Sequence, residues 1–158
     1  MSKKTKVYGI ALLSAWAVGG LAAFLTRNSN NIFDDIEVPP LTPPAIVFPI
    51  VWTVLYTLLG IGAALVYLNR DKHPKDAKSA LYLYCFDLAI NFAWSIIFFN
   101  LRNFGFAFWW LLVLLAVSIV MVAFFKRVSK LAAGLQIPYL LWISFAGYLT
   151  YMIYYLNR

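Results

Sequence analysis

Five predominantly apolar runs, each long enough to cross a lipid bilayer, constrain this chain more than any other feature. They cover residues 7–25, 44–67, 81–100, 105–125 and 134–156. A membrane-spanning helix needs about 20 such residues, and only helices or closed barrels satisfy their backbone hydrogen bonds in lipid. With 63% hydrophobic and 12% charged residues, the chain is too apolar for a soluble domain of 158 residues. The sequence therefore predicts an all-α integral membrane protein, in which residues 1–158 form a single domain, a bundle of five transmembrane helices.

The 13 Lys and Arg residues are distributed unevenly between alternate connections. Most precede the first run or lie in segments 68–80 and 126–133, whereas Arg27, Arg102 and Arg158 stand alone in the remaining segments. The positive-inside rule then predicts a cytoplasmic N-terminus and an outer C-terminus, and we expect the plasma membrane of a bacterium. In a soluble protein a net charge of +7 would suggest nucleic-acid binding. Here the basic clusters flank apolar runs, so we expect no nucleic-acid partner.

The first run follows three lysines, as a signal peptide would, but its 19 or so residues exceed the usual apolar core of about 7 to 15. We therefore predict a retained helix. Ala15, Gly19 and Ala23 recur on it at intervals of four residues. Small residues at this spacing let another helix approach closely. They indicate either packing inside the bundle or the seam of a homodimer.

Few residues could carry conventional catalysis or bind a metal. Cys85 is the only cysteine and lies in an apolar run, which excludes an internal disulfide and a cysteine-based metal site. His73, the only histidine, lies among basic residues in a short connection and is interpreted as solvated. No catalytic triad, phosphate-binding glycine loop or metal-ligand motif can be assembled. We expect no catalytic residues and no metal.

Polar and aromatic side chains share one face of each of three predicted helices. A carboxyl group at the depth of Asp87 costs about 2.5–3.5 kcal/mol to insert and usually faces a bundle interior. Each stripe alone is also compatible with core packing or an interfacial belt. Together they predict a cavity for a large, flat, mostly apolar ligand with polar edges. The stripes are Phe48, Trp52 and Tyr56; Asp87, Asn91, Trp94, Ser95 and Phe98; and Tyr139, Trp142, Ala146 and Thr150.

A proline-rich segment precedes the second predicted helix. Pro39, Pro40, Pro43 and Pro44 favour an extended chain that becomes helical at about residue 44, since proline is tolerated only in the first turn of a helix. Pro49 lies one turn further along and predicts a kink. The extended part belongs to the long polar connection, residues 26–43.

Three motifs recur here in the order and spacing of one known family: PPLTPPAIVFPIVWTVLY at 39–56, NFAWSIIFFN at 91–100 and PYLLWISFAGYL at 138–149. On these motifs the chain closely resembles the translocator protein family, also called tryptophan-rich sensory proteins or peripheral benzodiazepine receptors (TspO/MBR). The resemblance implies a five-helix membrane protein, commonly a homodimer. Such proteins bind porphyrins such as protoporphyrin IX and haem as ligands rather than obligatory cofactors, and animal members also bind sterols and benzodiazepine-type compounds.

Carried over by motif, the resemblance implies that Trp52, Asn91, Trp94, Ser95, Trp142 and Ala146 contact the ligand. It also implies that the connection 26–43 covers the pocket as a lid. We expect the lid to include Phe33, Pro39, Pro40, Leu41, Pro43 and Pro44.

The chain departs from the family pattern at three positions. Leu41 replaces a common tryptophan, Asp87 replaces an amide residue, and Thr150 stands where asparagine is common. The Asp87 carboxyl could stay protonated and donate a hydrogen bond, or ionise and favour a cationic ligand edge. These differences predict an altered ligand preference.

The resulting functional hypothesis is a membrane receptor or sensor that binds tetrapyrroles in an aromatic-lined cavity. The alternatives are an enzyme that degrades bound porphyrin in light and a transporter of porphyrins or sterols. Five helices without inverted repeats fit alternating access poorly.

Overall fold

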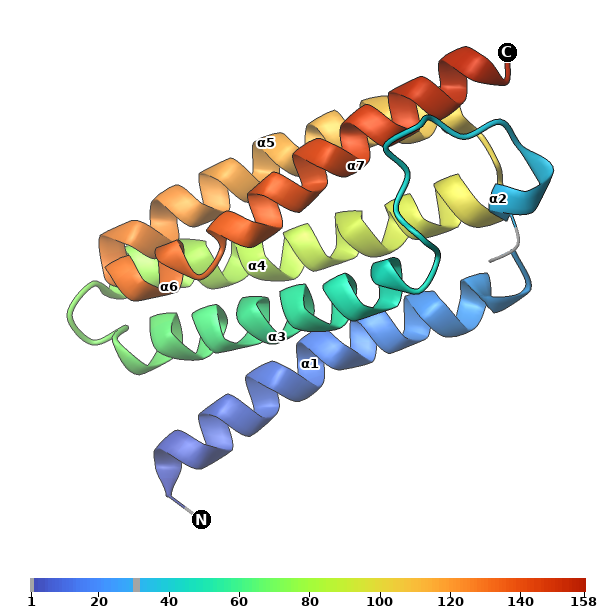
Figure 1. Cartoon of the computed structure of the whole chain (residues 1–158). Coiled ribbons are helices and arrows are strands. Elements are labelled where there is room, and N and C mark those ends of the chain that lie inside the picture. The colour runs from blue at the N-terminus through green and yellow to red at the C-terminus, as the bar shows by residue number, and fades with distance from the viewer. Residues whose placement is uncertain (1, 30–31) are drawn as a thin grey trace.

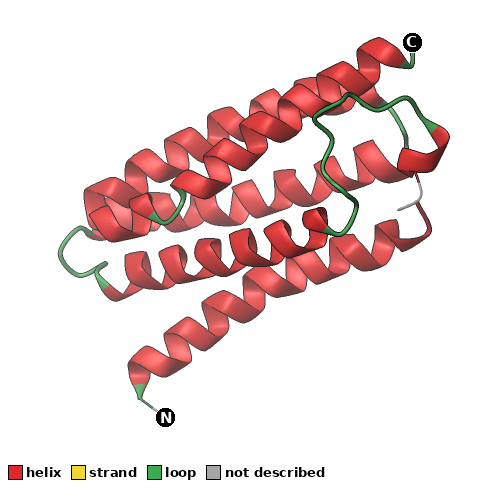
Figure 2. Ribbon diagram, viewed as in Figure 1, coloured by secondary structure: helices red, strands yellow, loops and turns green. Residues whose placement is uncertain are grey.

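The computed structural model of the chain describes residues 2–29 and 32–158. Its described residues are almost all helical, as Figure 2 shows, and contain no strand. The elements are α1 (Lys3–Thr26), the short 3-10 helix η1 (Arg27–Ser29), α2 (Ile32–Asp35), α3 (Val47–Leu68), α4 (Pro74–Ser95), the π-helix η2 (Ile96–Asn100), α5 (Phe104–Val128), α6 (Lys130–Gly134) and α7 (Ile137–Leu156).

Within the described part of the chain, five helical segments are long and apolar enough to cross a membrane: α1, α3, α4 with η2, α5, and α6 with α7. The predicted fold class, an all-α membrane protein with five spanning helices, is therefore confirmed. Figure 1 shows the long helices side by side, with α1 next to α3 and α4 next to α5.

The N-terminus, the connection between α3 and α4, and the junction of α5 and α6 lie at one end of the bundle (Figure 1). These are the segments that carry the clustered lysines and arginines. The C-terminus and α2 lie at the other end. The fold thus gathers the basic clusters at one end, while the orientation of that end in a membrane stays a prediction.

Proline chemistry explains where α3 begins. The chain turns twice before it, with Val47 N donating to Pro44 O at 2.9 Å and Phe48 N donating to Ala45 O at 3.3 Å. The helix starts at Val47, three residues later than expected, and Pro49 occupies its third position. A backbone N–H in the first turn has no intrahelical partner, so proline costs nothing there. The predicted kink at Pro49 is therefore wrong, because Ala45 O has a donor in Phe48.

The third predicted span starts earlier than expected and ends at Asn100, as expected. It begins at Pro74 rather than residue 81, with proline in the first turn and the charged residues of 75–78 already helical. At its other end the α-helix gives way at Ile96 to a π-helix, in which Leu101 N donates to Ile96 O at 3.0 Å. Such π segments are rare and occur often at functional sites. Within it the rings of Phe98 and Phe99 make an edge contact, with centroids 4.9 Å apart.

Candidate ligand-binding cavity

A cavity of about 680 Å³ lies between α1, α3, α4 and α7, and α2 contributes one side chain to it. Its volume falls within the range of roughly 300–1,000 Å³ that small-molecule sites occupy. Most of the wall is apolar or aromatic. The lining residues are Trp16, Gly19, Gly20, Ala22, Ala23, Thr26, Phe33, Ala45, Ile46, Phe48, Pro49, Trp52, Thr53, Tyr56, Trp94, Ser95, Phe98, Phe99, Ala146, Leu149, Thr150 and Ile153.

Four rings from α3, α4 and η2 form a continuous row along this cavity, which we call the aromatic wall: Tyr56, Trp52, Trp94 and Phe98. Ring centroids are 5.7 Å apart for Tyr56 and Trp52, and 6.2 Å apart for Trp52 and Trp94. Trp94 and Phe98 stack at 5.4 Å. Helical spacing places Trp52 and Tyr56 on one face of α3, and Trp94 and Phe98 on one face of the α4–η2 segment. The wall offers ring faces against which a flat ligand can stack.

Two indole N–H groups beside the cavity have no acceptor among the described residues, and both are buried. They belong to Trp94, in the aromatic wall, and to Trp142 on α7. By contrast, the hydroxyls of Thr53, Ser95 and Thr150 donate to carbonyls of their own helices. A buried donor without a partner is costly, and a ligand acceptor can relieve that cost.

The first helix contributes a part of the cavity that sequence reasoning missed. Trp16, Gly20 and Ala22 all line it, beside Gly19 and Ala23. The sequence signal for this face was the spacing of the small residues. Ala15 is fully buried and Gly19 lies against the Tyr56 ring, whereas Ala23 is exposed. A homodimer seam on this helix stays a prediction.

Behind the aromatic wall, polar side chains of four helices form a hydrogen-bonded network. Tyr56 on α3 donates from its hydroxyl to Asn91 Oδ1 at 3.1 Å, and Asn91 Nδ2 donates to the Tyr139 hydroxyl oxygen at 2.9 Å. Tyr139 on α7 donates to Asp87 Oδ2 at 2.6 Å, and the Ser118 hydroxyl on α5 donates to Asp87 Oδ1. We call these five residues the polar network. Its members are all buried, and Tyr56 alone among them lines the cavity.

The cavity thus brings together most of the predicted ligand contacts, and their role stays a prediction. Asp87, Asn91 and Tyr139 lie behind its wall rather than in it. Sequence spacing placed them on the correct side of their helices, but it carried no signal that Ser118 would lie against Asp87. The predicted contacts that line the cavity are Phe48, Trp52, Tyr56, Trp94, Ser95, Phe98 and Ala146.

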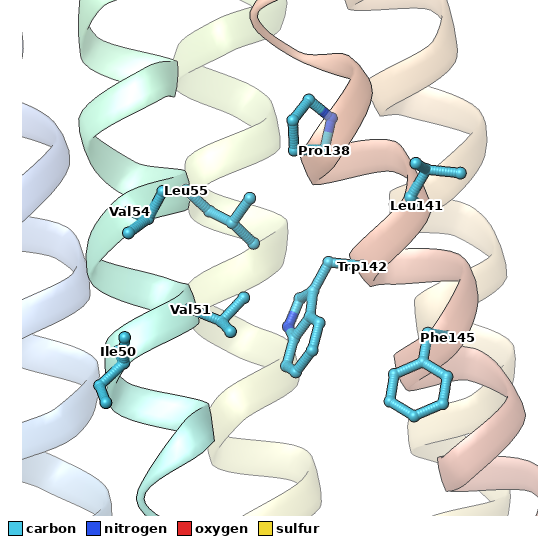
Figure 3. A pocket seen from close by; sticks show the side chains of 8 residues that line it. All are labelled: Ile50, Val51, Val54, Leu55, Pro138, Leu141, Trp142 and Phe145. Carbon is cyan, nitrogen blue, oxygen red and sulfur yellow. The ribbon is translucent and has the colours of Figure 1, made fainter. Parts of the chain in front are cut away.

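Trp142 lies between the cavity and an outer groove of about 480 Å³ that runs between α3 and α7. Its ring makes an edge contact with Phe48 of the cavity wall, with centroids 5.9 Å apart. Figure 3 shows the indole extending from α7 toward Val51 on α3. The other groove residues are apolar, and Ile50 and Leu141 are more than half exposed.

The connection predicted as a lid crosses the end of the bundle near the C-terminal part of α7 (Figure 1). Phe33 stacks on Phe48 at 5.4 Å and lines the cavity, as Ala45 and Ile46 do. None of the predicted prolines 39, 40, 43 and 44 lines it, and Leu41 is 64% exposed.

Polar contacts between three pairs of residues hold this connection in place. The Asn157 side chain accepts from Glu37 N at 2.9 Å and donates to Glu37 O at 2.8 Å. Arg102 forms an ion pair with Asp35 at 3.1 Å. The Ser29 hydroxyl donates to Asn100 Oδ1 at 3.1 Å. The connection is thereby tied to the ends of η2, α5 and α7.

Comparison with known proteins indicates the family to which this chain belongs. The model of the TspO/MBR family matches residues 10–156. The Translocator protein of Bos taurus is 33% identical over 141 residues, which cover 89% of this chain and 83% of that protein. The Tryptophan-rich protein TspO of Chlorobaculum tepidum is 32% identical over 99% of both chains, and that of Archaeoglobus fulgidus is 33% identical over 93% of this chain and 94% of its own. A match over nearly the whole length, on a bundle of five spanning helices, makes this chain a member of the TspO/MBR family.

Proposed function

We propose that the protein binds tetrapyrroles such as protoporphyrin IX and haem in the cavity and acts as a membrane receptor or sensor for them. The observation that carries the proposal is the aromatic wall, in which two indoles, Trp52 and Trp94, lie between Tyr56 and Phe98. A row of ring faces suits a macrocycle with an extended π surface. The buried Trp94 N–H, which has no acceptor within residues 2–29 and 32–158, suits a ligand with acceptor groups at its edge.

Titration of the purified protein with protoporphyrin IX, followed by the porphyrin's own absorbance, tests the proposal. The probe reports the ligand rather than the tryptophans, so a lost indole cannot imitate lost binding. We expect saturable binding that Ala146→Phe abolishes, because Ala146 lines the cavity and a phenyl ring there fills it. Ala123→Phe is the matched control, since Ala123 is exposed on α5. Equal binding by both variants, or no saturation in the unmodified protein, would refute a porphyrin site in the cavity.

A second titration asks whether the aromatic wall supplies the affinity. Trp52→Leu removes a ring from the wall, whereas Trp109→Leu removes a ring that is 67% exposed. Loss of stacking on one ring costs about 0.5–1.5 kcal/mol beyond the area lost, so Trp52→Leu should weaken binding several-fold or more. Trp109→Leu should leave the affinity unchanged.

We further propose that the basic end of the bundle faces the cytoplasm of a bacterial cell. A single cysteine introduced at Lys72 or at Leu41, in a Cys85→Ser background, distinguishes the two ends by labelling of intact cells with an impermeant thiol reagent. Labelling at position 41 and protection at position 72 is the expected pattern, and the opposite pattern reverses the orientation.

A further inference from the structure

The hydrogen bonds of the polar network run in one direction. The Tyr139 hydroxyl donates its only hydrogen to Asp87 Oδ2, so its oxygen can accept a hydrogen bond from Asn91 Nδ2. This turns the amide of Asn91 so that its Oδ1 faces Tyr56. The Tyr56 hydroxyl then donates to that oxygen, which belongs to a residue that does not line the cavity.

The direction matters because Tyr56 is the member of the polar network that lines the cavity. Because the Tyr56 hydrogen is donated to Asn91, the phenol offers no hydrogen-bond donor to a ligand in the cavity. Two other groups of the cavity lining also donate their hydrogens within the protein: the Trp16 indole donates to Thr57 Oγ1 at 3.0 Å, and the Thr26 hydroxyl donates to Ala22 O at 2.9 Å. The polarity of the cavity wall at Tyr56 is therefore set by residues that a ligand does not touch.

We propose that Asp87 is a positioning residue that determines ligand specificity: by accepting from Tyr139, it fixes the direction of the polar network and keeps Tyr56 from donating to a ligand. The inference rests on the proposed function only for the identity of the ligand. It holds whether or not Asp87 carries a charge. A proton on Oδ1 would be directed at Ser118, whose hydroxyl also lies 2.8 Å from Leu114 O, and Oδ2 would still accept from Tyr139.

An amide at this position permits the opposite direction. In the Asp87→Asn variant the new NH₂ group can donate to the Tyr139 oxygen, and Tyr139 can donate to Asn91 once that amide has rotated. Asn91 Nδ2 then donates to the Tyr56 oxygen, which releases the Tyr56 hydrogen toward the cavity. The variant should gain affinity for ligands with an anionic oxygen at their edge, because such an oxygen is a strong acceptor.

Two porphyrins that differ in this respect provide the test: protoporphyrin IX, with free carboxylates, and its dimethyl ester. The ratio of their affinities should shift toward the acid in Asp87→Asn by about tenfold or more, the size expected of one hydrogen bond to a charged group. The shift should vanish when Tyr56→Phe is added, because the released hydrogen is then absent. Ser118→Ala is the control, since it removes a partner of Asp87 but leaves the Tyr139 bond, and it should not change the ratio. An unchanged ratio in Asp87→Asn, or a shift that survives Tyr56→Phe, would overturn the proposal.

A second measurement needs no ligand. The side-chain amide of Asn91 can be observed by NMR after ¹⁵N-asparagine labelling. In the unmodified protein Nδ2 faces Tyr139, so Tyr139→Phe should move this resonance more than Tyr56→Phe does; in the Asp87→Asn background the order should reverse. A larger effect of Tyr56→Phe in the unmodified protein contradicts the proposed direction. If the unmodified protein bound no porphyrin, the proposed function would fail, while this comparison would still decide the direction of the network.

Discussion

Gly19 on α1 lies so close to the ring of Tyr56 on α3 that a Cβ atom on Gly19 would stand 2.6 Å from two ring carbons. That distance is shorter than van der Waals contact allows, so α1 can approach α3 here only without a side chain. The Tyr56 ring cannot simply move aside, because its hydroxyl is hydrogen-bonded to Asn91 and its face lies next to Trp52. The close approach of two helices and the shape of the cavity thus depend on the same contact.

Gly19→Ala should therefore destabilise the bundle by about 1–3 kcal/mol, the cost usually seen when a methyl group is forced into a packed interior. Thermal unfolding in detergent measures this as a lower transition temperature. Gly9→Ala is the matched control, because a Cβ atom at Gly9 meets nothing within 4 Å and alanine is the better helix former. Equal transition temperatures for the two variants would show that the Tyr56 ring yields freely.

A second prediction concerns Asn157 and the local opening of the connection between α1 and α3. Its side chain makes two hydrogen bonds to the backbone of Glu37, and Asn157→Ala removes both. Because the site is exposed, we expect local opening to become easier by about 1 kcal/mol, or roughly fivefold. Hydrogen exchange of peptides within residues 32–46 should accelerate by that factor, while exchange in α5 stays unchanged.

Asp35→Asn is the appropriate comparison for that experiment. It removes the ion pair with Arg102, whose two side chains are about half exposed. Exposed pairs contribute about 0–1 kcal/mol, so exchange in the same peptides should change less than in Asn157→Ala. A larger effect of Asp35→Asn would show that the ion pair, rather than Asn157, holds the connection.

The number and position of the spanning helices could be predicted because each run has to be long and apolar to cross a bilayer. The part of the cavity on α3 was also predictable, since Trp52 and Tyr56 stand out on an apolar helix. The part on α1 was not: this helix is apolar on all sides, so no periodicity separates the face with Trp16 and Gly20 from the faces that would meet lipid. For the same reason, the sequence could not predict which residues of neighbouring helices contact each other. The burial of Asp87 followed from its cost in lipid, but its partner Ser118 is one serine on an apolar helix, and no spacing rule connects it to α4.

The last prediction concerns Gln136, at the junction of α6 and α7. The Gln136 amide Nε2 donates to Leu58 O on α3 and to Ala132 O on α6, both at 3.1 Å, and Gln136 is fully buried. Opposite it on α3 lies Gly62, where a Cβ atom would stand 2.2 Å from Nε2. Gly62→Ala should therefore displace this amide and lower the free energy of unfolding by about 1–3 kcal/mol.

The same region offers a control substitution and a second substitution that should relieve the clash at position 62. Gly134→Ala should be tolerated, since a Cβ atom there meets nothing within 4 Å. In the double variant Gly62→Ala, Gln136→Ala the contact with Nε2 is removed and only Phe125 Cε2, at 3.0 Å, stays close to the new Cβ atom. Its destabilisation should therefore fall short of the sum of the two single variants by about 0.5–3 kcal/mol. Strict additivity of the two substitutions in thermal unfolding would mean that the Gln136 side chain does not limit what can stand at position 62, and that the junction of α6 with α3 is held by other contacts.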